Sequence, residues 1–449
     1  MGTDTVRAQA AQKAAERRRE QRGWYFYDWA CSVYSTSVLT VFLGPYLTSV
    51  AKHAADADGF VHPLGIPIRA GSFFAYSVSA SVILSIFVMP IAGAAADRTG
   101  RRKPLLAASA YLGAAATTGM FFLAGDRYLL GGLLLIVANA SVAVSMVLYN
   151  SYLPQIAPPE ERDAVSSRGW AFGYAAGSLV LVVNLILFTA HDSFGISEST
   201  AVRICLASAG VWWGAFTLVP LKRLRDRRAT PSQKASVPGW RQLAATVRDM
   251  RGKPLTLAFL LAYLVYNDGI QTVISQASLY GSEELGLSQS TLIVAVLLVQ
   301  LLAVVGALGM GRLARTYGAK RTILGSLVAW TVTLGAGYFL PAGAPFWFFV
   351  LAAGIGLVLG GSQALSRSLF SHLVPSGKEA EYFSAYEMSD RGMSWLGPLL
   401  FGLTYQLTGS YRDAILSLVA FFVLGFVLLA RVPVRQAVRD AGNPVPDRI

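Results

Sequence analysis

The sequence repeats a charged segment about 218 residues apart. GAAADRTGRRK runs from Gly93 to Lys103, and a diverged copy, GRLARTYGAKR, runs from Gly311 to Arg321. A second pair, SYLPQIAP at 151–158 and SLFSHLVP at 368–375, is offset by 217 residues. Nearly half of the chain is therefore duplicated in the same orientation, so the two halves are predicted to share one fold.

Apolar runs in each half are long enough to cross a bilayer, which needs about 20 residues. Apolar residues make up 54% of the chain and charged residues 14%, which excludes an ordinary soluble domain of this length. Twelve spans are predicted: 24–50, 70–96, 104–124, 128–153, 166–190, 200–221, 254–281, 289–313, 321–340, 345–372, 381–407 and 411–431. The expected fold is an all-α membrane protein of twelve helices in two six-helix repeats.

Basic residues alternate between the loops that these spans define. Of 38 Lys and Arg residues, all but Lys52, Arg69, Arg127, Arg203 and Arg412 fall on one side. The positive-inside rule then predicts that both termini are cytoplasmic. The net charge of +13 accordingly indicates topology and contact with lipid headgroups, not a nucleic-acid partner.

The polar segments outside the spans complete the domain organisation. We expect a basic cytoplasmic arm (1–23), a first half (24–221), a cytoplasmic linker with an amphipathic helix (222–253), a second half (254–431) and a cytoplasmic tail (432–449). The arm has no apolar core typical of a signal peptide. Cys31 and Cys205 lie inside predicted spans without metal-ligand spacing, so neither a disulfide, a metal site nor a cofactor is expected.

The Gly93–Lys103 loop carries the most specific motif, G-x-x-x-D-R-x-G-R-[RK]. Gly93 and Gly100 permit a tight turn, and Asp97 can face the positive end of a neighbouring helix. Arg98, Arg101 and Arg102 can reach carboxylates and phosphates. This motif and its place between the second and third spans resemble the Major Facilitator Superfamily, in which such a loop latches the outward-open state. The second copy has Arg315 in place of the acid and Ala319 in place of an arginine, so its latch should be weaker or different.

Polar residues inside the spans are the candidate binding residues, because burying them in a bilayer is costly. Asp28 follows Tyr27 in the first span, and Asp268 follows Asn267 in the seventh, so both acids are expected in the inner half of the bilayer. They could bind a proton, a sodium ion or a substrate amine, and we favour this over a purely structural hydrogen bond. Tyr34 and Gln271 are expected to supply further hydrogen bonds.

Other polar candidates lie near the inner ends of later spans. Asn150 and Arg367 occupy matching positions in the two repeats, and Gln363 lies one turn before Arg367. Glu387 and Asp390 lie early in the eleventh span, where local charge pairing could satisfy them. For this group a structural role is favoured, although Asn150, Gln363 and Arg367 are kept as candidates for substrate or ion binding.

Within the superfamily the chain resembles the fungal vacuolar amino-acid effluxers linked to autophagy and their unassigned bacterial relatives. The resemblance is carried by YDWA at 27–30, YN at 149–150 through PPEE at 158–161, GWAFGY at 169–174, YNDG at 266–269, GSQALSRS at 361–368, and Gly397-Pro398. It implies efflux or exchange of amino acids or similar solutes. Cys31 departs from the family's usual asparagine, which puts substrate identity in doubt.

The sequence therefore predicts a monomeric secondary transporter of the inner (plasma) membrane, which moves a small polar solute by alternating access between its halves. It is not expected to be an enzyme, because no catalytic constellation stands at membrane depth. No ATP-binding loop occurs, so an ion or solute gradient, with H+ or Na+ as coupling ion, should drive transport. A sugar–cation symporter, a drug–proton antiporter and a non-transporting receptor or scaffold remain as alternatives.

Overall fold

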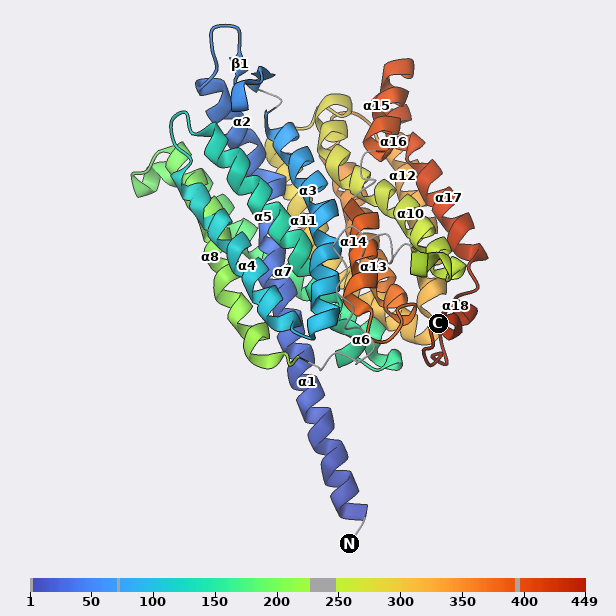
Figure 1. Cartoon of the computed structure of the whole chain (residues 1–449). Coiled ribbons are helices and arrows are strands. Elements are labelled where there is room, and N and C mark those ends of the chain that lie inside the picture. The colour runs from blue at the N-terminus through green and yellow to red at the C-terminus, as the bar shows by residue number, and fades with distance from the viewer. Residues whose placement is uncertain (1–2, 71–72, 227–247, 392–395) are drawn as a thin grey trace. The chain divides into compact units, whose positions relative to one another are not determined.

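The computed structural model describes residues 3–70, 73–226, 248–391 and 396–449. These parts are almost entirely helical (Figure 1). Ten of the described helical segments are long and apolar enough to cross a bilayer. The chain is therefore a multi-pass, helical membrane protein.

Two of the twelve expected spans do not meet this test of length and hydropathy. One is α12 (Ala319–Tyr338), whose first turn carries Lys320 and Arg321. The other is the eleventh, which consists of α14 (Glu379–Arg391) and α15 (Leu396–Thr408) on either side of undescribed residues. Four acids lower the hydropathy of α14, since it carries Glu379, Glu381, Glu387 and Asp390.

The described residues pack into two compact units. Unit 1 comprises residues within 1–149 and 175–234, and unit 2 comprises residues within 150–174 and 235–449. The connection after the fourth expected span, together with the beginning of the fifth, thus packs with the second half of the chain.

Unit 1 begins with α1, which includes the described part of the basic arm and the beginning of the first expected span; η1 and α2 contain the rest of that span. Its elements are α1 (Thr3–Val33), η1 (Tyr34–Phe42), α2 (Leu43–His53), β1 (Phe60–Val61), η2 (Pro63–Gly65), β2 (Ile68–Arg69), α3 (Phe73–Thr99), α4 (Arg102–Gly119), η4 (Met120–Phe122), α5 (Tyr128–Asn150, up to Tyr149), the end of α7 (Arg162–Thr189), η6 (His191–Phe194) and α8 (Glu198–Arg223). The N-terminal part of α1 extends beyond the other helices of its unit (Figure 1). The short hairpin of β1 and β2 was not predicted, because each of its strands has only two residues.

Small residues allow the helices of unit 1 to approach closely. Gly210 on α8 lies against the backbone of Thr118, and a Cβ on Gly177 of α7 would lie 2.6 Å from Thr36 Oγ1. Close backbone approach of this kind is how helices associate in a membrane, where no hydrophobic force drives them together.

Unit 2 contains the remaining elements. They are α6 (Leu153–Ile156), η5 (Pro159–Glu161), the beginning of α7, α10 (Pro254–Leu279), η8 (Tyr280–Glu284), α11 (Gln289–Tyr317), α12, α13 (Pro345–His372), α14, α15, α16 (Tyr411–Ser417), α17 (Val419–Arg431) and α18 (Val434–Asp440). Trp330 on α12 stacks on Phe422 of α17, with ring centroids 5.2 Å apart. The amphipathic linker helix expected in 222–253 falls largely on residues 227–247, outside the described residues.

The distribution of exposed and buried side chains is that of a lipid-embedded bundle. Large apolar side chains point outward, as Phe87 (62% exposed) and Val332 (65% exposed) do. Meanwhile Asp28, Asp268 and Arg367 are buried in the interior. A soluble protein rarely exposes so much contiguous apolar surface. The polar interior therefore holds the candidate functional groups.

Candidate functional site

Asp28 of α1 is held by the end of α5 in unit 1. The Tyr149 hydroxyl donates to Asp28 Oδ2 over 2.5 Å. Trp24, one turn before Asp28, stacks on Tyr149 at 4.4 Å and donates its Nε1–H to the Tyr149 carbonyl over 2.9 Å. A hydrogen bond to a charged carboxylate is stronger than a neutral one. This carboxylate is therefore anchored, and sequence reasoning missed Tyr149 as its partner.

Aromatic rings surround this acid. Tyr27 and Tyr34 are completely buried; the Tyr27 ring lies 5.1 Å from Tyr149 and the Tyr34 ring 5.9 Å from Trp213. Cys31, the residue that departs from the resembled family, is buried as a free thiol on the same helix. The first-half candidates thus form one aromatic, acid-containing cluster.

The Gly93–Lys103 loop joins α3 to α4 through a tight turn. Gly100 has φ of 65°, a left-handed conformation that glycine adopts without strain. Arg102, the first residue of α4, pairs with Asp97 at 2.5 Å, and both side chains are nearly completely buried. Gly93 is buried, Arg98 half-buried and Arg101 exposed. Asp97 and Arg102 are therefore paired inside the loop, whereas Arg101 is open to solvent.

Asp97→Asn is expected to reduce transport several-fold while leaving the protein folded, because Arg102 would lose its buried counter-charge. Solute flux and a size-exclusion profile of the purified variant measure the two effects. Asp126→Asn removes the same charge from an exposed loop residue and serves as the control. Wild-type flux in Asp97→Asn would show that the pair has no gating role.

Arg367 of α13 is at the centre of a buried polar network in unit 2. Its Nε donates to Ser166 Oγ (2.9 Å), and one terminal nitrogen donates to the Ser166 carbonyl (2.8 Å). The guanidinium carbon lies 5.3 Å from the centre of the Trp170 ring, a cation–π distance. Arg367 therefore fixes the beginning of α7 against α13. Neither Ser166 nor Trp170 was predicted, because both look like ordinary membrane-helix residues.

Asn150 extends this network toward α14. Its Oδ1 accepts from Arg367 (3.3 Å), and its Nδ2 donates to Glu387 Oε1 (2.7 Å). Asn150 and Arg367 are the repeat-related positions singled out in the sequence, and they contact each other directly. The amide thus lies between a buried cation and a buried carboxylate, which accounts for three polar side chains at membrane depth.

Two further contacts hold residues 150–174 in unit 2. Arg162 donates to the Ser371 carbonyl over 2.9 Å, and the Tyr174 hydroxyl donates to Gln363 Oε1 over 2.9 Å. The predicted candidate Gln363 is thus engaged with α7. The contact of Arg162 was not predicted, because a basic residue near a loop is typical of the charges that set membrane topology.

Asn267 and Asp268, the neighbouring candidates of the seventh expected span, have different hydrogen-bond partners. Asn267 Nδ2 donates to Asp390 Oδ1 of α14 (2.5 Å), and Tyr263 donates to the same oxygen (3.1 Å). Asp268 faces α15 instead: its Oδ2 accepts the Gly397 N–H over 2.7 Å. Gln271 is half-buried. The structure therefore places Asn267 and Asp268 in separate environments.

Asp249, at the end of the linker, is attached to α14. It pairs with Lys378 at 2.9 Å and accepts from the Tyr382 hydroxyl at 2.7 Å. Partial burial opposes ionisation, but these two groups hold the pKa of Asp249 below its ordinary value. The carboxylate is thus charged at neutral pH and connects the linker to α14.

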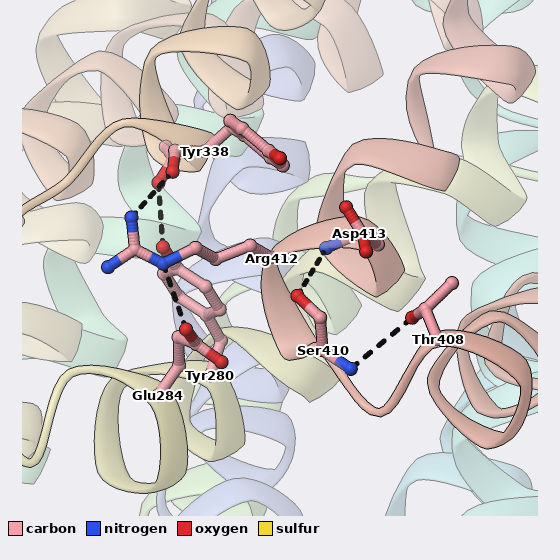
Figure 2. Close-up of polar contacts among 8 residues, drawn as sticks. Tyr280, Glu284, Tyr338, Thr408, Ser410, Arg412 and Asp413 are labelled. Carbon is pink, nitrogen blue, oxygen red and sulfur yellow. Dashed lines mark hydrogen bonds and ion pairs between the residues drawn. The ribbon is translucent and has the colours of Figure 1, made fainter.

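An ion pair at the other end of unit 2 links three elements (Figure 2). Arg412 of α16 donates through Nε to Glu284 Oε1 of η8 (2.8 Å) and through a terminal nitrogen to the Tyr338 carbonyl of α12 (2.9 Å). Nearby, Tyr280 donates to the Gly337 carbonyl (2.6 Å). Arg412 is one of only five basic residues predicted outside. Its ion pair with Glu284 and its hydrogen bond to Tyr338 were not predicted, because these partners are distant in sequence.

Glu284→Gln is expected to destabilise unit 2 by on the order of 1 kcal/mol. The side chains of Glu284 and Arg412 are about a quarter exposed, so solvent weakens their ion pair. Thermal unfolding of the purified protein measures this loss. A double-mutant cycle with Arg412→Gln isolates the pairwise part. Fully additive effects of the two substitutions would contradict the interaction.

The fold is that of the major facilitator superfamily. The Escherichia coli fucose:proton symporter FucP matches with a TM-score of 0.69 at 14% identity, covering 93% of this chain and 98% of that one. At this identity the likeness shows the fold of the chain.

The family model described as "Vacuole effluxer Atg22 like" matches residues 16–442, and the chain belongs to this family. The MFS-type transporter YxiO of Bacillus subtilis is 30% identical over 418 residues, covering 92% of this chain and 95% of YxiO. Autophagy-related protein 22 of Coccidioides immitis is 27% identical, covering 94% of this chain and 88% of its own. The family resemblance predicted from the sequence is confirmed.

Proposed function

We propose that this transporter moves an amino acid or a related small polar metabolite, by efflux or exchange, across the plasma membrane. Membership of a family described as vacuole effluxers supports efflux, and the resemblance to fungal amino-acid effluxers implies the class of solute. The match to a Bacillus transporter over nearly its full length supports a plasma-membrane location. The excess of Lys and Arg in alternate loops supports cytoplasmic termini and twelve crossings.

The observation that carries the proposal is the set of buried charges inside the helices. Asp28, Asp268 and Arg367 are each at most 4% exposed, and ionisable groups at such depth are rare outside substrate and ion pathways. Each unit therefore carries buried ionisable groups of the kind that recognise the ammonium or the carboxylate of an amino acid. Tyr27, Tyr34, Asn150, Asn267, Gln271 and Gln363 are proposed to add hydrogen bonds.

The Arg367 network is proposed to serve as the inner gate. It holds residues 150–174 against α13 and α14 with at least five hydrogen bonds from three buried side chains: Asn150, Arg162 and Arg367. The bonds from Arg367 to Ser166 and from Arg162 to the Ser371 carbonyl would have to break or rearrange for the beginning of α7 to separate from α13. Alternating access then consists of making and breaking this network, with the Asp97 loop as a second latch.

Uptake of a pooled, labelled amino-acid mixture into proteoliposomes tests the proposal. With an imposed proton gradient, one or a few species should accumulate, and protein-free liposomes give the background. If folded protein moves none of them, the amino-acid assignment is wrong. The same preparation is then tested with sugars and cationic drugs, and absence of any flux would favour a receptor or scaffold.

A further inference from the structure

The two membrane acids that look equivalent in the sequence are not equivalent in the structure. Asp28 is anchored by the Tyr149 hydroxyl. Asp268 is 3% exposed, and one of its oxygens, Oδ2, accepts the Gly397 N–H. Its other oxygen, Oδ1, is buried and has no hydrogen-bond partner among the described residues.

A buried carboxylate with an unsatisfied oxygen is costly, and more so at membrane depth. The usual remedy is a neighbouring cation, and among the described residues no ion pair to Asp268 is present; its hydrogen bond there is from the Gly397 N–H. Beside it, α17 brings Phe421 and Phe422 to the adjacent Gly269, and α15 brings Gly397. On α14, Asp390 is engaged by Asn267 and Tyr263, and on α13, Ser366 is engaged by Tyr266.

The surroundings of Oδ1 suit a proton better than a metal cation. A cation such as Ca²⁺ or Mg²⁺ takes about six oxygen ligands, and Na⁺ in transporters is likewise held by several carbonyls. Among the described residues, Oδ1 has no hydrogen-bond partner that could serve as a further ligand. A proton needs only the carboxylate oxygen itself.

We propose that Asp268 is the group that carries the coupling proton, and that Asp28 is not. This assignment rests on the proposed transport function, which it refines. Protonation would neutralise the carboxyl and remove the cost of its buried, unsatisfied oxygen.

The position of Asp268 also connects protonation to helix packing. Gly397 belongs to α15, so its N–H bond to Asp268 Oδ2 joins α10 to α15. The two helices approach so closely there that a Cβ on Gly397 would overlap Thr272 Oγ1. Protonating Asp268 weakens its charge-assisted bond to α15, so the proton changes a contact between α10 and α15.

The direct test is an infrared pH titration of the purified full-length protein in the carboxylic-acid C=O region. Wild type should show a protonated-carboxyl band that grows as pH falls, and Asp268→Asn should lose it. Asp28→Asn should retain the band. Asp268→Glu keeps a titratable carboxyl and should shift its midpoint, which guards against a folding defect in the asparagine variant.

A band unchanged in Asp268→Asn and in Asp268→Glu would overturn the assignment, whatever the flux. A band lost in Asp28→Asn instead would transfer the role to Asp28. Because this readout needs no solute, it is independent of the amino-acid proposal. In proteoliposomes that do transport, Asp268→Asn should lose accumulation driven by the proton gradient, whereas undiminished accumulation would contradict the proposal.

Discussion

Arg367→Ala is expected to reduce transport at least tenfold and to destabilise the protein by about 1–3 kcal/mol, the usual cost of leaving a buried acceptor without its donor. Arg367 is 1% exposed. Its removal leaves the Ser166 carbonyl without this donor and deprives Asn150 of the cation that orients its amide. Flux in proteoliposomes and thermal unfolding in detergent measure the two losses.

Two controls separate the network from charge alone. Arg367→Lys keeps the charge but not the planar, multiply donating guanidinium, so it should recover only part of the activity. Arg439→Ala removes an exposed arginine from α18 and should change neither quantity. Wild-type flux and stability in Arg367→Ala would show that the network is not the inner gate.

The second large effect is expected from Gly306→Ala at the contact between α11 and α13. A Cβ at Gly306 would overlap the backbone carbonyl of Leu357, which cannot move aside as a flexible side chain could. Overpacking typically destabilises a protein by about 1–3 kcal/mol. Because the overlap here is with backbone, we expect a loss of stability at or above the upper end of this range. The variant should therefore unfold at a clearly lower temperature and lose flux.

Gly309, on the same helix, provides the matched control. A Cβ there would meet nothing within 4 Å, and alanine favours a helix over glycine by about 1 kcal/mol. Gly309→Ala should thus be neutral or slightly stabilising. Equal effects of the two substitutions would mean that the close approach of α11 and α13 is unimportant.

Much of the fold was predictable because membrane helices leave a strong sequence signal. Ten expected spans are present as apolar helices, since the bilayer demands long runs whose backbone groups are satisfied internally. The turn at Gly100 was predictable for a similar reason, because the left-handed conformation favours glycine.

The partners within the candidate site were much less predictable. Duplication identified Asn150 and Arg367 as matching positions, yet their contact with each other depends on packing. Similarly, YDWA and YNDG suggest equivalent acids, although one acid accepts from a tyrosine hydroxyl and the other from a backbone N–H. Pairing between residues more than 100 positions apart leaves no periodic pattern in a single sequence.

The measurement that most directly tests alternating access is counterflow. Proteoliposomes are loaded with an unlabelled amino acid found in the uptake screen, and entry of the same labelled compound is followed without any ion gradient. A transporter that alternates between two sides should show a transient overshoot of label, which Arg367→Ala should abolish. A wild-type protein that binds the amino acid but shows no overshoot would contradict the account.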